Sequence, residues 1–187
     1  MEQRNKHLIF ILVIYVIYIN LFTGYVSYLP TIPVYPNNEK DLDIVKKEMI
    51  SRTQEDIDFF FNTNDSVVHV FLPYVNETEE ELNDVATSQN RIIHFFKNVI
   101  NRRRPYQIDS ELEPLSTLTS QTPSYPAGHA YQSLLVASHL SKKYPHKKRL
   151  FDNIAAKCDG CRVKAGLHYK SDGEFSGKLF RAFNYKN

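Results

Sequence analysis

The chain has 187 residues, of which 42% are hydrophobic and 24% are charged, and its mean hydropathy is −0.40. This length fits one domain with or without a targeting segment, and the ordinary composition excludes wholesale disorder and a collagen-like fibre. The formal net charge of +2 is too small to indicate a nucleic-acid-binding protein, so we expect no nucleic-acid partner. Two cysteines exclude a scaffold built on disulfides.

A long apolar segment near the N-terminus indicates membrane anchoring or export. Residues 8–29 carry no formal charge, and they are about as long as a helix that crosses a bilayer. Arg4 and Lys6 precede them, which predicts residues 1–7 as a short cytoplasmic N-terminus and the remainder as extracytoplasmic. We therefore expect a single-pass membrane protein with an uncleaved signal anchor. Because the small residues Thr23, Gly24 and Ser27 lie near the end of this segment, the alternative is a cleaved signal peptide and a secreted or periplasmic product.

Residues 30–38 form a proline-rich spacer, and residues 39–187 are expected to form the domain, with mainly helical patterning. Apolar side chains recur on one helical face from Glu39 to Phe61. The short apolar run from Val67 to Tyr74 fits either a strand or a loop.

A longer helix is predicted to start at the N-cap Asn76 and to end at Pro105. The Ser-, Thr- and Pro-rich segment from Asp109 to Ser124 is expected to be a loop. Further helical patterns follow, and they cover Tyr131–Leu140, Leu150–Ala156 and the amphipathic stretch that contains Phe175, Leu179 and Phe183. No stretch alternates convincingly like a strand, so the predicted fold class is all-α, a helical bundle behind a membrane anchor.

Three separated clusters contain candidate catalytic or anion-binding residues. The first cluster is basic. Lys97 and Arg104 are seven residues apart, about two turns, so in one helix they would project from nearly the same face. Such a pair can grip a dianion, and arginine adds a bidentate fork. The alternatives are a set of basic residues that complements the dipole at a helix C-terminus, and a solvated patch formed by Arg102, Arg103 and Arg104.

The second cluster opens the helix predicted at Tyr131, and it reads Ser124-Tyr125-Pro126-Ala127-Gly128-His129. Gly128 would let backbone N–H groups approach an anion at a helix N-terminus. His129 could donate a proton near neutral pH. The alternative is a glycine-containing turn beside a surface histidine.

The third cluster consists of Arg162, His168 and Asp172. Histidine and aspartate four residues apart meet on one helical face or across a helix start, so the carboxylate can fix the imidazole tautomer. The second ring nitrogen is then available as a nucleophile, while Arg162 can neutralise the group under attack. The alternative is an ion pair on a helix surface.

Taken in order, the three clusters read Lys-x6-Arg-Pro, Pro-x-Gly-His and Arg-x5-His-x3-Asp. These resemble the three signature motifs of the type 2 phosphatidic acid phosphatase superfamily, which also contains the vanadium haloperoxidases. Over residues 124–129 and 166–172, the sequence around the motifs is most similar to that of the bacterial class A non-specific acid phosphatases. The resemblance covers residues 97–183, and residues 39–91 carry no signature of their own.

The resemblance implies a metal-independent phosphatase that hydrolyses phosphate monoesters through a phosphohistidine intermediate. His168 would attack phosphorus, Asp172 would orient His168, and His129 would protonate the leaving alkoxide. The phosphate-binding groups would be Lys97, Arg104, Arg162 and the backbone near Gly128. No metal or other cofactor is expected, the substrate would be a phosphorylated small molecule or lipid, and an oligomer is compatible with the sequence.

Two positions depart from the family pattern. Ala127 stands where the family usually has a serine that contacts phosphate, and Cys161 replaces the usual serine before Arg162. We expect an active enzyme that is slower for the loss of one hydrogen bond. Cys158 and Cys161 are compatible with either a local disulfide or two reduced thiols.

Three other functions fit some of these features. The anchor suggests a lipid phosphate phosphatase held near a bilayer. The superfamily also includes vanadium haloperoxidases, although Ala127 speaks against firm vanadate binding. From a different class, Ala127 suggests an inactive membrane protein that binds anions without turning them over.

Overall fold

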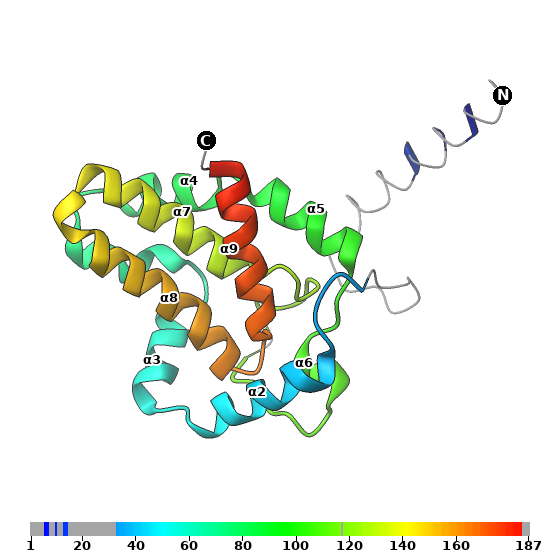
Figure 1. Cartoon of the computed structure of the whole chain (residues 1–187). Coiled ribbons are helices and arrows are strands. Elements are labelled where there is room, and N and C mark those ends of the chain that lie inside the picture. The colour runs from blue at the N-terminus through cyan, green and yellow to red at the C-terminus, as the bar shows by residue number, and fades with distance from the viewer. Residues whose placement is uncertain (1–5, 8–9, 11–12, 15–32, 117, 185–187) are drawn as a thin grey trace.

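The computed structural model describes residues 6–7, 10, 13–14, 33–116 and 118–184 (Figure 1). Every regular element in the domain part of these ranges is helical and no strand occurs there, so the described chain is all-α as predicted. Apart from positions 10, 13 and 14, the predicted anchor at residues 8–29 lies outside the described residues. Among the residues that are described, no helix combines the length and the apolar character needed to cross a membrane.

The first half of the domain consists of short helices, which are α2 (Asn38–Ile50), α3 (Gln54–Asn62), the 3-10 helices η1 (Val67–Val70) and η2 (Leu72–Tyr74), α4 (Glu79–Thr87), α5 (Asn90–Ile100) and α6 (Pro105–Ile108). The second half consists of longer helices, which are α7 (Gly128–Lys143), the 3-10 helix η3 (Pro145–Lys147), α8 (Lys148–Lys164) and α9 (Lys170–Asn184). The predicted loop at residues 109–124 contains no helix among its described residues.

The sequence periodicity joined elements that the structure separates. The helix predicted over residues 39–61 is broken into α2 and α3, because Thr53 and Asp56 form a reciprocal capping box that starts a new helix. The segment predicted as strand or loop, residues 67–74, forms η1 and η2 instead.

The helix predicted from Asn76 to Pro105 is likewise divided. Thr78, not Asn76, is the N-cap of α4, and its capping-box partner is Glu81. The α5 helix ends at Ile100, because Asn101 adopts a left-handed conformation with φ of 52°. Pro105 therefore begins α6 and does not terminate a longer helix.

The α7 helix lies at the centre of the bundle, with α8 and α9 packed beside it (Figure 1). The larger core joins α7 and α8 to α4 and η1, and its fully buried side chains include Val68, Leu82, Leu140 and Phe151. A second core lies among α5, α7 and α9 and contains Ile93, Tyr131, Leu135, Leu179 and Phe180. Burial of these apolar faces fixes the helices relative to one another, and so it also fixes the groups at their ends.

Candidate active site

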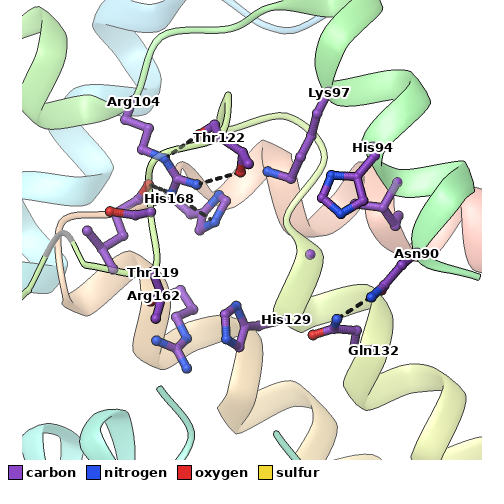
Figure 2. A pocket seen from close by; sticks show the side chains of 14 residues that line it. Asn90, His94, Lys97, Arg104, Thr119, Thr122, His129, Gln132, Arg162 and His168 are labelled. Atoms are coloured by element: carbon purple, nitrogen blue, oxygen red, sulfur yellow. Dashed lines mark hydrogen bonds between the residues drawn. The ribbon is translucent and has the colours of Figure 1, made fainter. Parts of the chain in front are cut away.

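One pocket brings together six of the seven residues that the sequence motifs single out. It has a volume of about 170 Å³. The motif residues in its wall are Gly128 and the five labelled in Figure 2, which are Lys97, Arg104, His129, Arg162 and His168. The seventh, Asp172, is fully buried behind His168. The three motifs, separated by up to 75 positions from Lys97 to Asp172, thus form one site.

The pocket lies where several helix ends meet. Lys97 is in the last turn of α5, His129 is in the first turn of α7, and Arg162 is in the last turn of α8. Our expectation that Lys97 and Arg104 project from one helix is wrong. Arg104 follows the break at Asn101 and is the extended N-cap of α6, as the steric restriction on a residue before proline favours.

His168 and Asp172 meet across a helix start, one of the two arrangements expected. His168 precedes α9, and its Nδ1 lies 2.9 Å from Oδ2 of Asp172 in the first turn. The same carboxylate oxygen accepts a hydrogen bond from the backbone N–H of Tyr169 at 2.9 Å. Because a carboxylate accepts, Nδ1 carries the proton in this pair, and Nε2 keeps its lone pair.

The turn that delivers His168 requires a glycine. Gly166 has φ of 75°, and an added Cβ would come within 3.1 Å of the sulfur and methyl of Met49. The turn is closed by hydrogen bonds from the backbone N–H groups of Leu167 and His168 to the carbonyl oxygen of Arg162. Arg162 and His168 therefore keep a fixed separation at the end of α8.

Nε2 of His168 faces a cation. It lies 3.1 Å from Nη1 of Arg104, which also donates to the carbonyl oxygen of Leu167 at 2.9 Å. Burial and the charge of Arg104 lower the pKa of His168 to about 3, against the opposing effect of Asp172. The resting imidazole is therefore neutral, which a nucleophile requires.

Three buried basic side chains surround the pocket without a carboxylate partner. Lys97, Arg104 and Arg162 are 4%, 2% and 1% exposed. None of them lies within 4.0 Å of an acidic oxygen among the described residues. Desolvation is the largest cause of the lowered pKa of each group.

Their hydrogen-bond partners are all neutral; they are carbonyl, hydroxyl and amide oxygens and, for Arg104, also Nε2 of His168. Lys97 donates to the carbonyl oxygen of Pro123, and Nε of Arg104 donates to that of Thr122 at 2.8 Å. Neutral acceptors offset only part of the desolvation free energy of a buried cation. A bound anion would offset more of it.

The loop between α3 and η1 holds Arg162 and His129, and no sequence motif predicted its role. Arg162 donates to the carbonyl oxygen and the hydroxyl of Thr63 and, at 3.3 Å, to Oδ1 of Asn64. Nε of Arg162 has no hydrogen-bond partner in the described part of the chain. The backbone carbonyl oxygen of Asn64 lies 3.2 Å from Nε2 of His129.

His129 is an imidazole in a cationic environment. Because a carbonyl oxygen only accepts, Nε2 carries a proton, and protonation of the ring adds a second proton at Nδ1. Burial first, and then the charge of Arg162, lower the pKa of His129 well below its ordinary value. A dianion in the pocket would raise that pKa by offsetting the positive charge around it.

The start of α7 provides backbone N–H groups and no side-chain cap. Ala127 is the N-cap residue and makes no side-chain capping hydrogen bond. A Cβ at Gly128 would lie at ordinary contact distance, 3.9 Å from Ile93 and 4.0 Å from Lys97, so space alone does not require glycine there. The first-turn N–H groups of α7 are the helix N-terminal donors that favour anions.

The two cysteines precede Arg162 on α8 and are both buried and free. Sγ of Cys161 lies 3.3 Å from the carbonyl oxygen of Cys158. Burial raises the pKa of both thiols, so they are unreactive at neutral pH. Of the two arrangements that the sequence allowed, the structure therefore has two reduced thiols.

A neutral polar wall lies across the pocket from Arg104 and Arg162, on the side where Lys97 also lies (Figure 2). It comes from α5 and α7, where Nε2 of Gln132 donates to Oδ1 of Asn90 at 3.0 Å and His94 lies beside them (Figure 2). Burial and the nearby charge of Lys97 lower the pKa of His94. Neither the motifs nor the periodicity identified these three residues, whose grouping depends on how α5 packs against α7.

Arg102 is a further buried basic residue that sequence reasoning missed. The run Arg102-Arg103-Arg104 was open to interpretation as a solvated patch, yet Arg102 is 0% exposed and Arg103 is exposed. Nη1 of Arg102 lies 2.7 Å from Oδ1 of Asp172. Arg102 therefore supports the site from behind the carboxylate that contacts His168.

Comparison with protein-family models and with curated proteins gave no match. Within the described residues, no three His, Cys, Asp or Glu side chains gather closely enough to hold a metal ion.

Proposed function

We propose that this protein is a phosphatase of the type 2 phosphatidic acid phosphatase superfamily that hydrolyses phosphate monoesters through a phosphohistidine. The observation that carries the proposal is the convergence of three buried cations, without a carboxylate partner in the described residues, on the pocket that holds His168. Phosphoryl transfer requires chiefly positioning and neutralisation of charge on the equatorial oxygens, which such a site supplies.

In the first step, Nε2 of His168 attacks phosphorus and the ester P–O bond breaks. Arg104 now donates to that nitrogen, so its N–H must turn to a phosphate oxygen when substrate binds, which exposes the lone pair. His129, which takes up a proton from solvent at Nδ1 when the dianion binds, gives that proton to the leaving alkoxide. Asp172 stabilises the positive charge that forms on His168.

In the second step, water attacks the phosphohistidine. The P–N bond breaks, its electrons return to Nε2 of His168, and neutral His129 accepts the proton of the attacking water. Both imidazoles thereby regain the protonation states that they had with the ester bound. When inorganic phosphate leaves, His129 returns its proton to solvent. The cycle requires no redox change and no further reactant.

The polar wall formed by α5 and α7 favours a small polar leaving group. Asn90, His94 and Gln132 offer neutral hydrogen-bonding groups, while the apolar side chains of the described lining belong to Ile93 and Leu167. An alcohol that forms hydrogen bonds, as in a sugar or nucleoside phosphate, fits this lining better than a diacylglycerol does. We therefore place soluble esters before phosphatidic acid.

A substrate panel tests the proposal. The full-length protein, in detergent, is assayed with p-nitrophenyl phosphate, sugar phosphates, nucleoside monophosphates and phosphatidic acid in mixed micelles. We expect turnover of the soluble esters and at least about a thousandfold loss in His168→Ala, as for other covalent nucleophiles. His139→Ala, an exposed histidine on α7, should keep wild-type rates. EDTA should leave the rate unchanged, because the three cations repel a divalent metal ion.

Each alternative has its own outcome. Preferential hydrolysis of phosphatidic acid would favour the lipid phosphatase. Halide oxidation with vanadate and peroxide would indicate a haloperoxidase, and vanadate binding without hydrolysis of any ester would indicate an inactive anion-binding protein. Equal activity of His168→Ala and His139→Ala would contradict the mechanism.

A further inference from the structure

Arg102 is held behind the active site by a complete set of hydrogen bonds. Nη1 donates to Oδ1 of Asp172 and to Oγ of Ser171, both at 2.7 Å. Nη2 donates to Oδ2 of Asp41 and Oδ1 of Asn38, both at 2.9 Å, and Nε donates to Asn38 at 3.0 Å. These bonds engage all five N–H donors of a guanidinium.

Aromatic rings cover the faces of the same guanidinium. Its central carbon lies 3.8 Å from the ring centroid of Tyr169 and 4.4 Å from that of Tyr35. The Tyr125 ring centroid is 5.6 Å away. The side chain of Arg102 is 0% exposed and enclosed by these rings, so its position is fixed.

This environment differs from that of the pocket cations. Arg102 has two carboxylate partners, Asp41 and Asp172, whereas Lys97, Arg104 and Arg162 have none in the described chain. Arg102 also does not line the pocket. Its charge is committed to the carboxylate that holds His168, so it is not available to a substrate.

Resting on the proposed function, we propose that Arg102 is a positioning residue that acts through Asp172 on His168. Arg102 occupies Oδ1 of Asp172, so Oδ2 is the oxygen presented to Nδ1 of His168. Its charge also limits how strongly the carboxylate attracts a proton onto the imidazole. Arg102 thereby keeps His168 neutral and correctly oriented before substrate binds.

The same geometry makes the start of the domain part of the catalytic apparatus. Asn38 and Asp41 belong to α2, and Tyr35 lies in the segment that the sequence predicts as a spacer. Ser171 donates to the carboxylate of Asp41, which closes the network between α2 and α9. The α2 helix therefore supports Asp172 from more than 130 positions away in the sequence.

Removal of Arg102 is expected to raise the pKa of His168. The charged and titratable groups facing His168 are those of Lys97 from α5, Arg104 before α6, His129 from α7, Arg162 from α8 and Asp172 from α9. Without the charge of Arg102, Asp172 attracts a proton on His168 more strongly. The imidazole then becomes protonated, and unable to attack, at a higher pH than in the wild type.

The test compares Arg102→Gln with Arg103→Gln, which removes the same charge at the adjacent exposed position. Two readouts are used for the full-length protein. The first is the pH dependence of kcat/KM on p-nitrophenyl phosphate, and the second is an NMR titration of the His168 ring nitrogens. For Arg102→Gln we expect a kcat about tenfold lower or more, KM within about threefold, and an acid limb moved to higher pH. Arg103→Gln should match the wild type.

Arg102→Lys keeps the charge without the fork, and it provides the comparison if Arg102→Gln does not fold. It should lower kcat and move the acid limb in the same direction by a smaller amount. A folded Arg102 variant with lower kcat but wild-type acid limb and His168 titration would overturn the proposal. A wild-type protein without turnover would contradict the proposed function alone, because the NMR titration still tests the coupling of Arg102 to His168.

Discussion

His129 is the residue whose assigned role depends most on its partners. Its Nε2 is committed to the carbonyl oxygen of Asn64, and buried positive charge suppresses its protonation in the resting site. In the proposed mechanism, a bound phosphate dianion raises its pKa, so that substrate binding itself supplies the protonated acid. As pH rises, His129 loses that proton and can no longer protonate the leaving group. Turnover is therefore expected to be fastest at acidic pH.

The leaving group provides the test of His129. For His129→Ala we expect alkyl phosphates to lose about 10²- to 10⁴-fold in kcat/KM, the range typical of a general acid. p-Nitrophenyl phosphate should lose much less, because p-nitrophenolate leaves without a proton. The measurement is kcat/KM across esters of graded leaving-group pKa, with His139→Ala as control. A uniform loss over the series would contradict the role of His129.

At the scale of elements, α8 and α9 meet at an unusual contact. Asp159 of α8 packs against Gly173 of α9. A Cβ atom added at Gly173 would overlap the carboxylate of Asp159. Oδ1 of Asp159 is buried without a hydrogen-bond partner in the described residues. Burial, and then the charge of Asp172, raise the pKa of Asp159 to about 7. The contact brings α9, which carries Asp172, close to α8, which carries Arg162.

This contact predicts a stability that depends on pH. Because the folded pKa of Asp159 lies above its unfolded value, its protonation favours the native state at low pH, and that contribution is lost as pH rises toward 7. Asp159→Asn should therefore be more stable than the wild type at pH 8, by about 1–2 kcal/mol, and similar to it at pH 4. Urea unfolding at both pH values measures this. Asp152→Asn, exposed on the same helix, is the control, and an equal pH profile for both variants would refute the prediction.

Helix boundaries also show why part of the fold was predictable and part was not. Apolar periodicity located the helical segments, but it did not distinguish one helix from two that share a buried face. The capping box at Thr53 is visible as a sequence pattern, and it divides the predicted helix into α2 and α3. The capping box at Thr78 only moves the start of α4 from the predicted N-cap at Asn76. The left-handed turn at Asn101 was harder to foresee, although asparagine tolerates that conformation.

The residues of the site likewise divide into those that the sequence predicted and those that it did not. Motif spacing identified the groups around the pocket, because each motif is local in sequence. Arg102 and Asn64 were missed, since their roles depend on contacts with Asp41, Arg162 and His129 that only tertiary packing creates. No pattern in residues 39–91 signals that α2 and the loop after α3 support the site.

At the scale of the whole molecule, the net charge of +2 is small, yet positive charge is concentrated at one place. The bundle places the charges of Lys97, Arg104 and Arg162 around one pocket, and each is almost fully buried. Folding therefore stores unfavourable desolvation and repulsion there. Any anion that binds the native pocket and not the unfolded chain must stabilise the whole fold.

Thermal unfolding measures that coupling. Phosphate or vanadate at about 100 times its dissociation constant should add about 2.7 kcal/mol, which corresponds to a Tm increase of roughly 5–10 °C for a protein of this size. Chloride at equal ionic strength should add little. Arg162→Gln should lose most of the increase, whereas Arg149→Gln, exposed on the same helix, should keep it. An increase that is equal in both variants would place anion binding elsewhere.

The most direct test of the account is chemical trapping of the covalent intermediate. Wild-type protein is mixed with p-nitrophenyl phosphate, quenched in base to preserve phosphohistidine, digested and analysed by mass spectrometry. We predict phosphate on His168 in the wild type and in His139→Ala, and none in His168→Ala. Turnover by the wild type with no phosphate on His168, or an equal level of phosphoprotein in His168→Ala, would contradict the account.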